Sequence, residues 1–319
     1  MKLINPSFEI IEQAPGIEGV YKQIELAARN CYKSESLITD DSYKKFLKML
    51  YNKEHLACFE HGTVYLSDSY DISAIGSFRN SIGEKYRNNK YSTVTFDSGC
   101  DFRGIYVTTN LRVLLENNWL DDLKYICEPT EYHEKRITIR FTADIHFYKD
   151  ITRHRLFSWA IESTRYCNYF GDKFNMSVSF MKPTWIKEED IQELEEDCKV
   201  IESIYFKWIN KGYQAQHAAY FLTQGVKADI IMTGFVSDYK HFFELRDSNK
   251  AHPDVQALAR PLHEEFIKRG YISDNIIKEY RNEINCHCTP ENIINDFDAL
   301  DVDSIKTTVD NESYIHKEK

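Results

Sequence analysis

Apolar residues recur along this chain with two periods, and each period predicts one type of element. Steps of three and four residues, with capping residues at their ends, predict helices at 17–33, about 40–52, 110–118, 120–127, 190–211 and from Pro253 onward. Alternation over 136–143 predicts a half-buried strand, and β-branched or aromatic runs predict strands at 63–66 and 91–96. Strands and helices mixed in this order indicate an α/β fold of the mixed α+β type.

Three further elements flank or follow the most polar part of the chain. The chain is expected to turn helical near Asp150, shortly before a run of arginines. After an apolar run at 228–236, Ser237 can cap a helix that carries His241 and Arg246. The long helix at 190–211 has apolar residues at three- and four-residue steps, which predicts a face packed on the core or on another subunit.

The densest polar chemistry lies at 153–166, here named the basic segment, which contains three arginines. Arginine presents a rigid fork of donors that matches phosphate oxygens, and serine hydroxyls can complete the shell around such a group. His154 stands between two arginines, so we expect its neutral form to be favoured. A basic run is often a solvated face paired to carboxylates. Here Phe157, Trp159 and Ile161 interrupt the polar residues, so partial burial is expected, and a buried arginine needs an anionic partner.

The acidic balance of the chain limits its partners. The 319 residues carry a formal net charge of −10, which disfavours polymeric nucleic acid but leaves room for a mononucleotide in a local basic pocket. With 42% hydrophobic residues, the chain can bury one large core or two modest ones. No apolar run approaches the length of a membrane span, and the first five residues lack signal-peptide architecture. We therefore expect no membrane partner and a cytoplasmic protein.

Cysteine and glycine patterns argue against several other chemistries. The eight cysteines include no CxxC pair, and Cys286-His287-Cys288 is their one tight cluster. That cluster lacks further ligands at zinc-site spacing, so we expect no metal and reduced thiols. Neither G-x-G-x-x-G nor a Walker loop is present, so side chains must hold any nucleotide. Cys167 has no clear activating neighbour in the sequence.

The basic segment resembles the signature of a known family. Arg153-His154-Arg155, followed by Ser158 and by Ser163-Thr164-Arg165-Tyr166, is similar to the signature of flavin-dependent thymidylate synthases, the ThyX family. The resemblance runs from about residue 4 to about residue 268. It implies a ThyX-like fold, with a twisted β-sheet packed against long helices, in homotetramers whose active sites lie between subunits. It also implies conversion of dUMP to dTMP, with 5,10-methylene-tetrahydrofolate as one-carbon donor and FAD reduced by NADPH.

The same resemblance divides the chain into regions. Residues 1–285 are expected to form the catalytic domain. Relative to compact family members, this domain carries an insertion at about 67–135, here named the inserted block. We expect the inserted block to extend one side of the domain rather than to form a domain of its own. The polar tail at 286–319 is expected to be weakly ordered.

Family roles carry over to individual positions. The resemblance implies that the flavin contacts His61, Thr63, Arg153, His154, Arg155 and His241. It implies that dUMP contacts Asp150, Arg153, Glu162, Ser163, Thr164, Arg165 and Arg246. Arg246 matches the family arginine that activates the pyrimidine by favouring ionisation at its ring nitrogen, because a fixed cation stabilises charge where it develops. The simpler alternative for Arg246 is a salt bridge at a helix end.

Several positions depart from the family pattern. The usual Asn-Glu reads Ala160-Ile161, an expected nucleotide-binding arginine is Ala219, and a flavin-binding Asn-x-Arg reads Phe235-Val236-Ser237. Loss of one charged hydrogen bond weakens binding about ten- to a hundredfold unless another cation, such as Lys227, replaces it. Two alternatives therefore stay open. One is a related flavoenzyme that acts on another pyrimidine nucleotide, and the other is a non-catalytic protein that binds nucleotide or flavin.

Overall fold

The computed structural model describes residues 1–71, 81–97 and 102–273. The chain divides at residue 272, and every helix and strand described belongs to the first unit, Met1–Ile272. The predicted tail at 286–319 and the Cys286-His287-Cys288 cluster lie outside the described residues. A catalytic domain that extends to residue 285 therefore stays a prediction.

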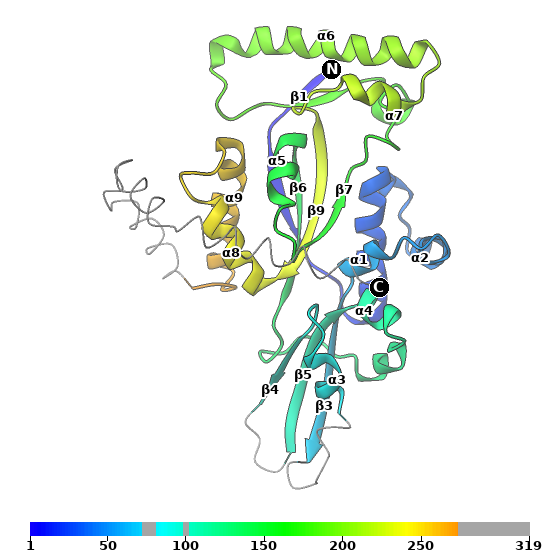
Figure 1. The fold of residues 1–319 in the computed structure, drawn as a ribbon, viewed down its shortest axis with the longest axis vertical. Helices are drawn as coiled ribbons and strands as arrows, with labels where there is room; N and C mark the ends of the chain where they lie inside the picture. The colour runs from blue at the N-terminus through cyan, green and yellow to red at the C-terminus, as the bar shows by residue number, and fades with distance from the viewer. Residues whose placement is uncertain (72–80, 98–101, 274–319) are drawn as a thin grey trace, which may run out of the picture. The chain divides into compact units, whose positions relative to one another are not determined.

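A four-stranded antiparallel sheet lies at the centre of the first unit (Figure 1). Its strands, in spatial order, are β2 (Ser7–Ile11), β6 (Arg136–Asp144), β9 (Lys227–Phe235) and β7 (Ser158–Ile161). β6 and β9 pair over their full lengths, with Arg136 opposite Phe235, and Ser158 of β7 lies opposite Thr233 of β9. β7 is thus an edge strand, and it carries the middle of the basic segment.

Helices cover both faces of this sheet. On one face, α5 (Ile145–Ile151), α8 (Val236–Arg246) and α9 (Pro253–Lys268) share a core with β6 and β9 that includes Phe141 and Phe242. On the other face, Ala27 of α1 (Gly16–Tyr32) packs with Ala160 and Ile231. The strand predicted at 136–143 is therefore confirmed as β6, but the prediction that it is half-buried was wrong. No residue of β6 is exposed, because the strand lies between two covered faces.

A second antiparallel sheet is built mainly by the inserted block. Its order is β3 (Thr63–Asp71), β5 (Phe102–Asn110) and β4 (Thr93–Phe96), and α3 (Ile82–Arg87) and α4 (Leu111–Glu116) accompany it. Leu66 and Val107 of this sheet share a core with Val20 and Ile24 of α1 and with Leu50 of α2 (Ser42–Asn52). The inserted block is thus joined to the N-terminal helices by common apolar packing.

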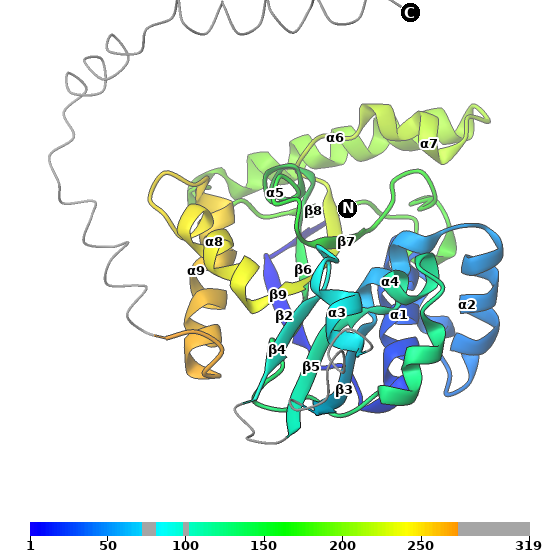
Figure 2. The same cartoon turned by 60° about the horizontal axis from the view of Figure 1, so that its bottom comes forward.

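A third core lies against the long helix α6 (Ile191–Asn210). It joins α6 to α7 (Ala215–Ala218) and to the parallel pair of β1 (Lys2–Ile4) and β8 (Ser179–Met181). Figure 2 shows α6 and α7 side by side. Within the described residues, only Cys198 and Tyr205 of α6 are buried, and the other residues of its apolar stripe stay partly exposed. No helix of the described residues is both long and apolar enough to cross a membrane.

Most of the predicted helices are confirmed, and three details need correction. Helices at 17–33, about 40–52, 110–118, 190–211 and from Pro253 correspond to α1, α2, α4, α6 and α9, and Asn110 caps α4 by accepting from the Val113 N–H at 3.2 Å. Residues 120–127 form a 3-10 helix instead, Leu120–Tyr125. The helix near Asp150 is α5, which ends before the basic segment. Ser237 does not cap α8, because the helix begins one residue earlier and Asp238 accepts from the Phe235 N–H at 3.3 Å.

Candidate active site

The end of α8 lies against the beginning of the basic segment, where α5 has just ended. Arg246 Nε donates to His154 Nε2 at 3.0 Å, and Arg246 Nη2 donates to the Asp150 carbonyl oxygen at 2.7 Å. His154 is buried, and its ring lies 5.2 Å from the Phe242 ring and 5.8 Å from the His241 ring. One turn of α8 and the loop after α5 therefore fix the direction of the Arg246 guanidinium.

His154 is held in its neutral form. Burial lowers its pKa most, and electrostatic interaction with Arg246 and with the His241 ring lowers it further, to about 4. A neutral ring is also what the geometry requires, because Nε2 must keep its lone pair to accept from Arg246. The sequence-based expectation of a neutral His154 is confirmed. The principal cause is burial rather than the two flanking arginines.

An open pocket of about 500 Å³, here named the Arg246 pocket, lies in front of this pair. Its walls include Arg153, Arg155 and His241 as well as His154 and Arg246. Arg153 is largely exposed and lies 3.5 Å from the Asp150 carboxylate. Arg155 is also exposed, and within the described part of the chain no hydrogen bond or ion pair engages it. The structure thus brings together five of the predicted site residues, with Asp150 directly behind them.

The second half of the basic segment lies beyond β7 and does not reach the Arg246 pocket. Glu162 is buried, where it accepts from the Asp229 N–H at 3.1 Å and from Lys227 Nζ at 2.8 Å. Ser163 N–H donates to the Cys31 carbonyl at 3.1 Å, and Arg165 is exposed. Neither Glu162 nor the run 163–165 lines that pocket. Within one chain, the strand β7 separates the two groups of predicted ligand contacts.

Lys227 is engaged in this second group. Its Nζ lies 2.8 Å from Glu162 and 2.5 Å from Asp229, and Asp229 also accepts from Lys33 Nζ at 2.6 Å. Two carboxylates therefore fix the Lys227 side chain. This argues against Lys227 as the cation that replaces the arginine expected at Ala219.

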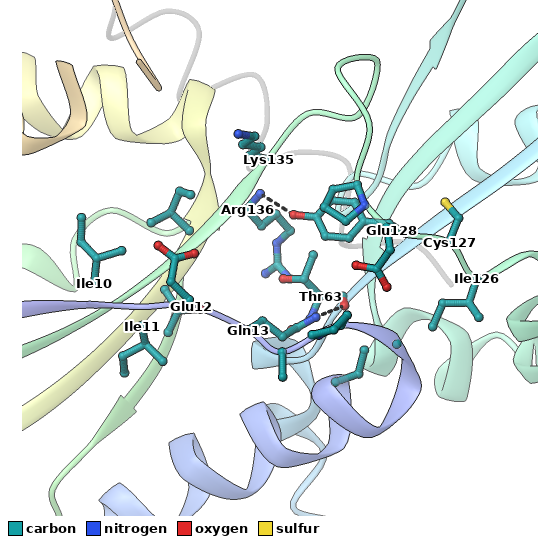
Figure 3. Close-up of a pocket in the computed structure, with 18 of the residues that line it drawn as sticks. Ile10, Ile11, Glu12, Gln13, Thr63, Ile126, Cys127, Glu128, Lys135 and Arg136 are labelled. Atoms are coloured by element: carbon teal, nitrogen blue, oxygen red, sulfur yellow. Dashed lines mark hydrogen bonds between the residues drawn. The ribbon is translucent and has the colours of Figure 1, made fainter. Parts of the chain in front are cut away.

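His61 and Thr63 occupy a third location, on the side of the central sheet that α1 covers. His61 Nδ1 lies 2.8 Å from Thr233 Oγ1, and burial together with Arg136 lowers the His61 pKa to about 3. Thr63 Oγ1 accepts from Arg136 Nη1 at 3.3 Å. Thr63 and Arg136 also line a cavity of about 290 Å³ beside Gln13, which Figure 3 shows. His61 and Thr63 are thus not in the Arg246 pocket.

Sequence reasoning missed a cavity that adjoins the Arg246 pocket. This cavity of about 320 Å³, here named the Lys90 cavity, shares Arg155 and Phe157 with that pocket. Its other walls come from the inserted block, through 90–93, and from Arg136 at the start of β6. The sequence contains signals for both, since Lys90 precedes an aromatic residue and two hydroxyl residues, and Arg136 opens a strand of alternating polar and apolar residues. Neither signal indicates that the two lie side by side.

The stretch of the chain that contains this site matches a known family model. Residues 129–269 match the family model described as thymidylate synthase complementing protein. The match includes the basic segment and α8, which together supply the walls of the Arg246 pocket, and it also spans β6, β7, β9, α5 and α9. The family resemblance of the basic segment is therefore confirmed over this stretch of the chain.

Individual relatives match over similar stretches. A protein named flavin-dependent thymidylate synthase from Pyrococcus furiosus is 34% identical over 126 residues, which are 38% of this chain and 50% of that protein. One of the same name from Sulfurisphaera tokodaii is 28% identical over 162 residues, covering 43% of this chain and 63% of that protein. The chain thus spans about half of the first relative's length and less than two thirds of the second's.

Among solved structures, the UMP/dUMP methylase PolB from Streptomyces cacaoi, bound with 5-Br UMP, is similar at 13% identity and a TM-score of 0.39. The similarity covers 84% of this chain and 92% of that one. A TM-score of this size does not show that the two folds are the same. The mixed α/β class of this chain rests on its own sheets and helices.

Proposed function

We propose that this protein is a flavin-dependent thymidylate synthase that converts dUMP to dTMP. The one-carbon unit comes from 5,10-methylene-tetrahydrofolate, and NADPH reduces the FAD cofactor. The observation that supports this most directly is the Arg246–His154 pair, held in an open pocket beside Arg153 and Arg155. Those residues lie within the stretch that matches the thymidylate synthase complementing protein family.

The described residues fit an anionic cofactor such as FAD. Arg155 has no partner in the described part of the chain, and Arg136, which lines the adjoining Lys90 cavity, has a buried Nε without a partner. Arg153, His154, Arg155 and His241 would hold the flavin at the Arg246 pocket. When bound, the flavin supplies the hydride that reduces the transferred one-carbon unit to a methyl group.

Arg246 has the position required to activate the nucleotide. Its guanidinium uses one nitrogen on His154 and another on the Asp150 carbonyl, so it is oriented before any ligand arrives. A pre-oriented cation stabilises a ring anion more than a flexible one, because no reorganisation is needed during the reaction. His154 serves this arrangement as a neutral acceptor, so it adds no competing positive charge. The Arg246 guanidinium then favours loss of the pyrimidine ring proton.

No cysteine of the described residues lies in the Arg246 pocket to act as a nucleophile on the pyrimidine. Cys167, the one nearest to the basic segment in sequence, is buried, and burial raises its pKa to about 12. The thiolate, which is the reactive form, is therefore scarce at neutral pH. This favours hydride chemistry over covalent attack by cysteine.

An assay with purified protein tests the proposal. We expect the protein to bind FAD, with a yellow colour and flavin absorbance, and to form dTMP from dUMP when methylene-tetrahydrofolate and NADPH are present. Mass spectrometry identifies the product. A colourless protein that does not take up FAD would count heavily against the proposal.

The ion pairs of Lys227 with Glu162 and Asp229 favour a second candidate, a related flavoenzyme that acts on another pyrimidine nucleotide. With Ile161 and Ala219 at expected nucleotide contacts and Lys227 held by carboxylates, the usual dUMP contacts are incomplete. The same assay, run in parallel with dUMP and dCMP, separates the two candidates. Formation of dTMP from dUMP alone removes the second one.

A site shared between subunits would reunite the two halves of the basic segment. We propose that Glu162, Ser163, Thr164 and Arg165 of one chain face the Arg246 pocket of another in a homotetramer. Supporting this, β7 separates these groups within one chain, and α6 leaves apolar residues partly exposed.

Mixing two inactive variants tests this arrangement. Arg246→Ala and Arg165→Ala should each be nearly inactive alone, yet co-refolded mixtures should recover activity. Random assembly gives about a quarter of sites with both arginines intact, as expected for a site shared by two chains. If both arginines act from the same chain, the mixture stays inactive, and size-exclusion chromatography confirms that mixed oligomers formed.

A further inference from the structure

We infer that the Lys90 cavity is a binding site for a phosphate or diphosphate group, and that the inserted block supplies part of it. Three cations from three separate elements line this cavity, namely Lys90, Arg136 and Arg155. The inference does not depend on the reaction catalysed. Only the assignment of the phosphate to the flavin rests on the proposed function.

Arg136 provides the strongest argument, because it is a buried cation that forms no ion pair within the described residues. Only 9% of the residue is exposed, and its Nη1 donates to the Glu60 carbonyl at 3.0 Å and to Thr63 Oγ1 at 3.3 Å. Its Nε is buried and has no partner, and the nearby carboxylates of Glu60 and Asp238 act on its charge only from beyond ion-pair distance. Figure 3 shows the side chain from the neighbouring cavity, where it extends toward Thr63 and Gln13. Burial of an unpaired guanidinium is costly, and a bound anion would remove that cost.

A second unpartnered group lines the same cavity. Thr93 Oγ1 is buried and has no hydrogen-bond partner within the described chain. Ser158 and Ser237 add hydroxyl groups to the walls. Hydroxyls together with guanidinium forks are the donors that surround phosphate oxygens in proteins. Two residues that line this cavity, one from β4 and one from β6, thus each carry an unpartnered polar atom.

The remaining two cations are accessible from solvent. Arg155 is exposed and unpaired within the described residues, and Lys90 Nζ lies 4.8 Å from the Tyr91 ring centre. The acidic residues in the lining are Glu60 and Asp238. Glu60 is neutralised by Arg112 at 2.5 Å, and Asp238 accepts from the Phe235 N–H. The lining therefore presents a positive excess in a protein whose net charge is −10.

The number of cations favours phosphate over a single carboxylate. One carboxylate would satisfy one arginine fork, whereas Arg136, Arg155 and Lys90 approach the cavity from different elements. A phosphate or diphosphate offers enough oxygens for all three. Arg155 also borders the Arg246 pocket, so a ligand that carries such a group could extend from one space into the other.

Pyrophosphate binding to the full-length protein, measured by calorimetry, tests the inference. We expect Lys90→Ala and Arg155→Ala each to weaken binding about tenfold, as for loss of one charge-assisted hydrogen bond. Lys124→Ala is the matched control, because Lys124 is also exposed, lies in the inserted block, and sits 4.8 Å over the Tyr125 ring. It should bind pyrophosphate as the unmodified protein does.

Arg136→Met adds a readout that a purely structural role would not give. Removal of an unpaired buried charge should leave the unfolding temperature of the ligand-free protein unchanged or higher. The increase in that temperature on adding pyrophosphate should disappear. If Arg136 is merely structural, the ligand-free protein unfolds at a lower temperature and the increase with pyrophosphate is retained.

Competition identifies the source of the phosphate. Displacement of pyrophosphate by FAD assigns the cavity to the diphosphate of the cofactor, whereas binding that FAD does not displace assigns it to another phosphate-bearing ligand. If Lys90→Ala, Arg155→Ala and Arg136→Met all bind pyrophosphate as tightly as the unmodified protein does, the inference is overturned, even if dUMP is methylated. Variant-sensitive binding in a protein that fails to methylate dUMP overturns the proposed function and leaves the inference standing.

Discussion

Replacement of Arg246 by alanine is expected to lower kcat/KM for dUMP methylation by about a hundred- to a thousandfold, the usual loss for one pre-oriented electrostatic group. The guanidinium is fixed by His154 Nε2 at 3.0 Å and by the Asp150 carbonyl at 2.7 Å. No other cation in the described part of the chain is bound to His154 in this way. Bound flavin should be largely retained, because Arg153 and Arg155 are untouched.

Steady-state kinetics and flavin absorbance measure this outcome together, with Arg269→Ala as the control. Arg269 pairs with Glu265 and Glu12 at the surface, so its loss should leave the kinetics unchanged. NMR of the histidine rings provides an independent readout. The pKa of His154, about 4 in the intact protein, should rise in Arg246→Ala because a nearby positive charge has gone. Complete loss of flavin from this variant would show that the role assigned to Arg246 is wrong.

Replacement of Asp229 by asparagine is expected to lower the free energy of unfolding by about 3 kcal/mol, the lower end of the range for breaking a buried ion pair. Asp229 is 8% exposed and holds both Lys33 and Lys227. Lys33 keeps Glu35 and Lys227 keeps Glu162, which is why the low end applies. Urea denaturation at pH 7 measures the change. Asp41→Asn, at an exposed carboxylate paired with Lys44, should produce no measurable change.

The pH dependence of this loss has a definite sign. Burial acts to raise the Asp229 pKa, but Lys227 and Lys33 more than offset it, so the pKa lies below its ordinary value of 3.8. A carboxylate with a lowered pKa contributes its full stabilisation when the pH is above the ordinary pKa. This contribution is lost as the pH falls through the pKa of the folded state. The difference between the unmodified protein and Asp229→Asn should therefore be constant from pH 7 to about pH 5 and shrink in stronger acid. A difference that had already vanished at pH 6 would contradict this account.

Local sequence pattern predicted the elements better than their burial. Asn110 could be predicted as a helix cap because its side chain accepts a hydrogen bond from a backbone N–H only three residues away. The burial of β6 is different, since its apolar residues pack against α8 and α9, which lie far away in sequence. The cap of α8 was misplaced for a similar reason. Ser237 and Asp238 can both accept a hydrogen bond from a backbone N–H at a helix start, and only the path of the backbone decides which of them does.

In the candidate site, too, local features could be predicted from the sequence and contacts between distant residues could not. The contiguous run at 153–155 could be found from sequence because three chemically distinctive residues adjoin. That His154 accepts from Arg246, 92 residues later, follows only from the packing of α8 against the loop after α5. The Lys90 cavity could not be predicted, because it combines an exposed lysine of the inserted block with an arginine whose burial is set by the central sheet. Lys227 could be proposed as a substitute cation until its two carboxylates were seen.

The short edge strand β7 determines how well the basic segment tolerates insertions and deletions. Ser158 and Ala160 are buried while Trp159 and Ile161 are only partly so, and all four are paired with β9. A one-residue slip in this pairing would turn each side chain to the opposite face of the sheet. It would also pull His154 away from Arg246 and Glu162 away from Lys227 in a single step. Single-residue insertions or deletions in β7 should therefore be far more damaging than substitutions, since they disconnect both ends simultaneously.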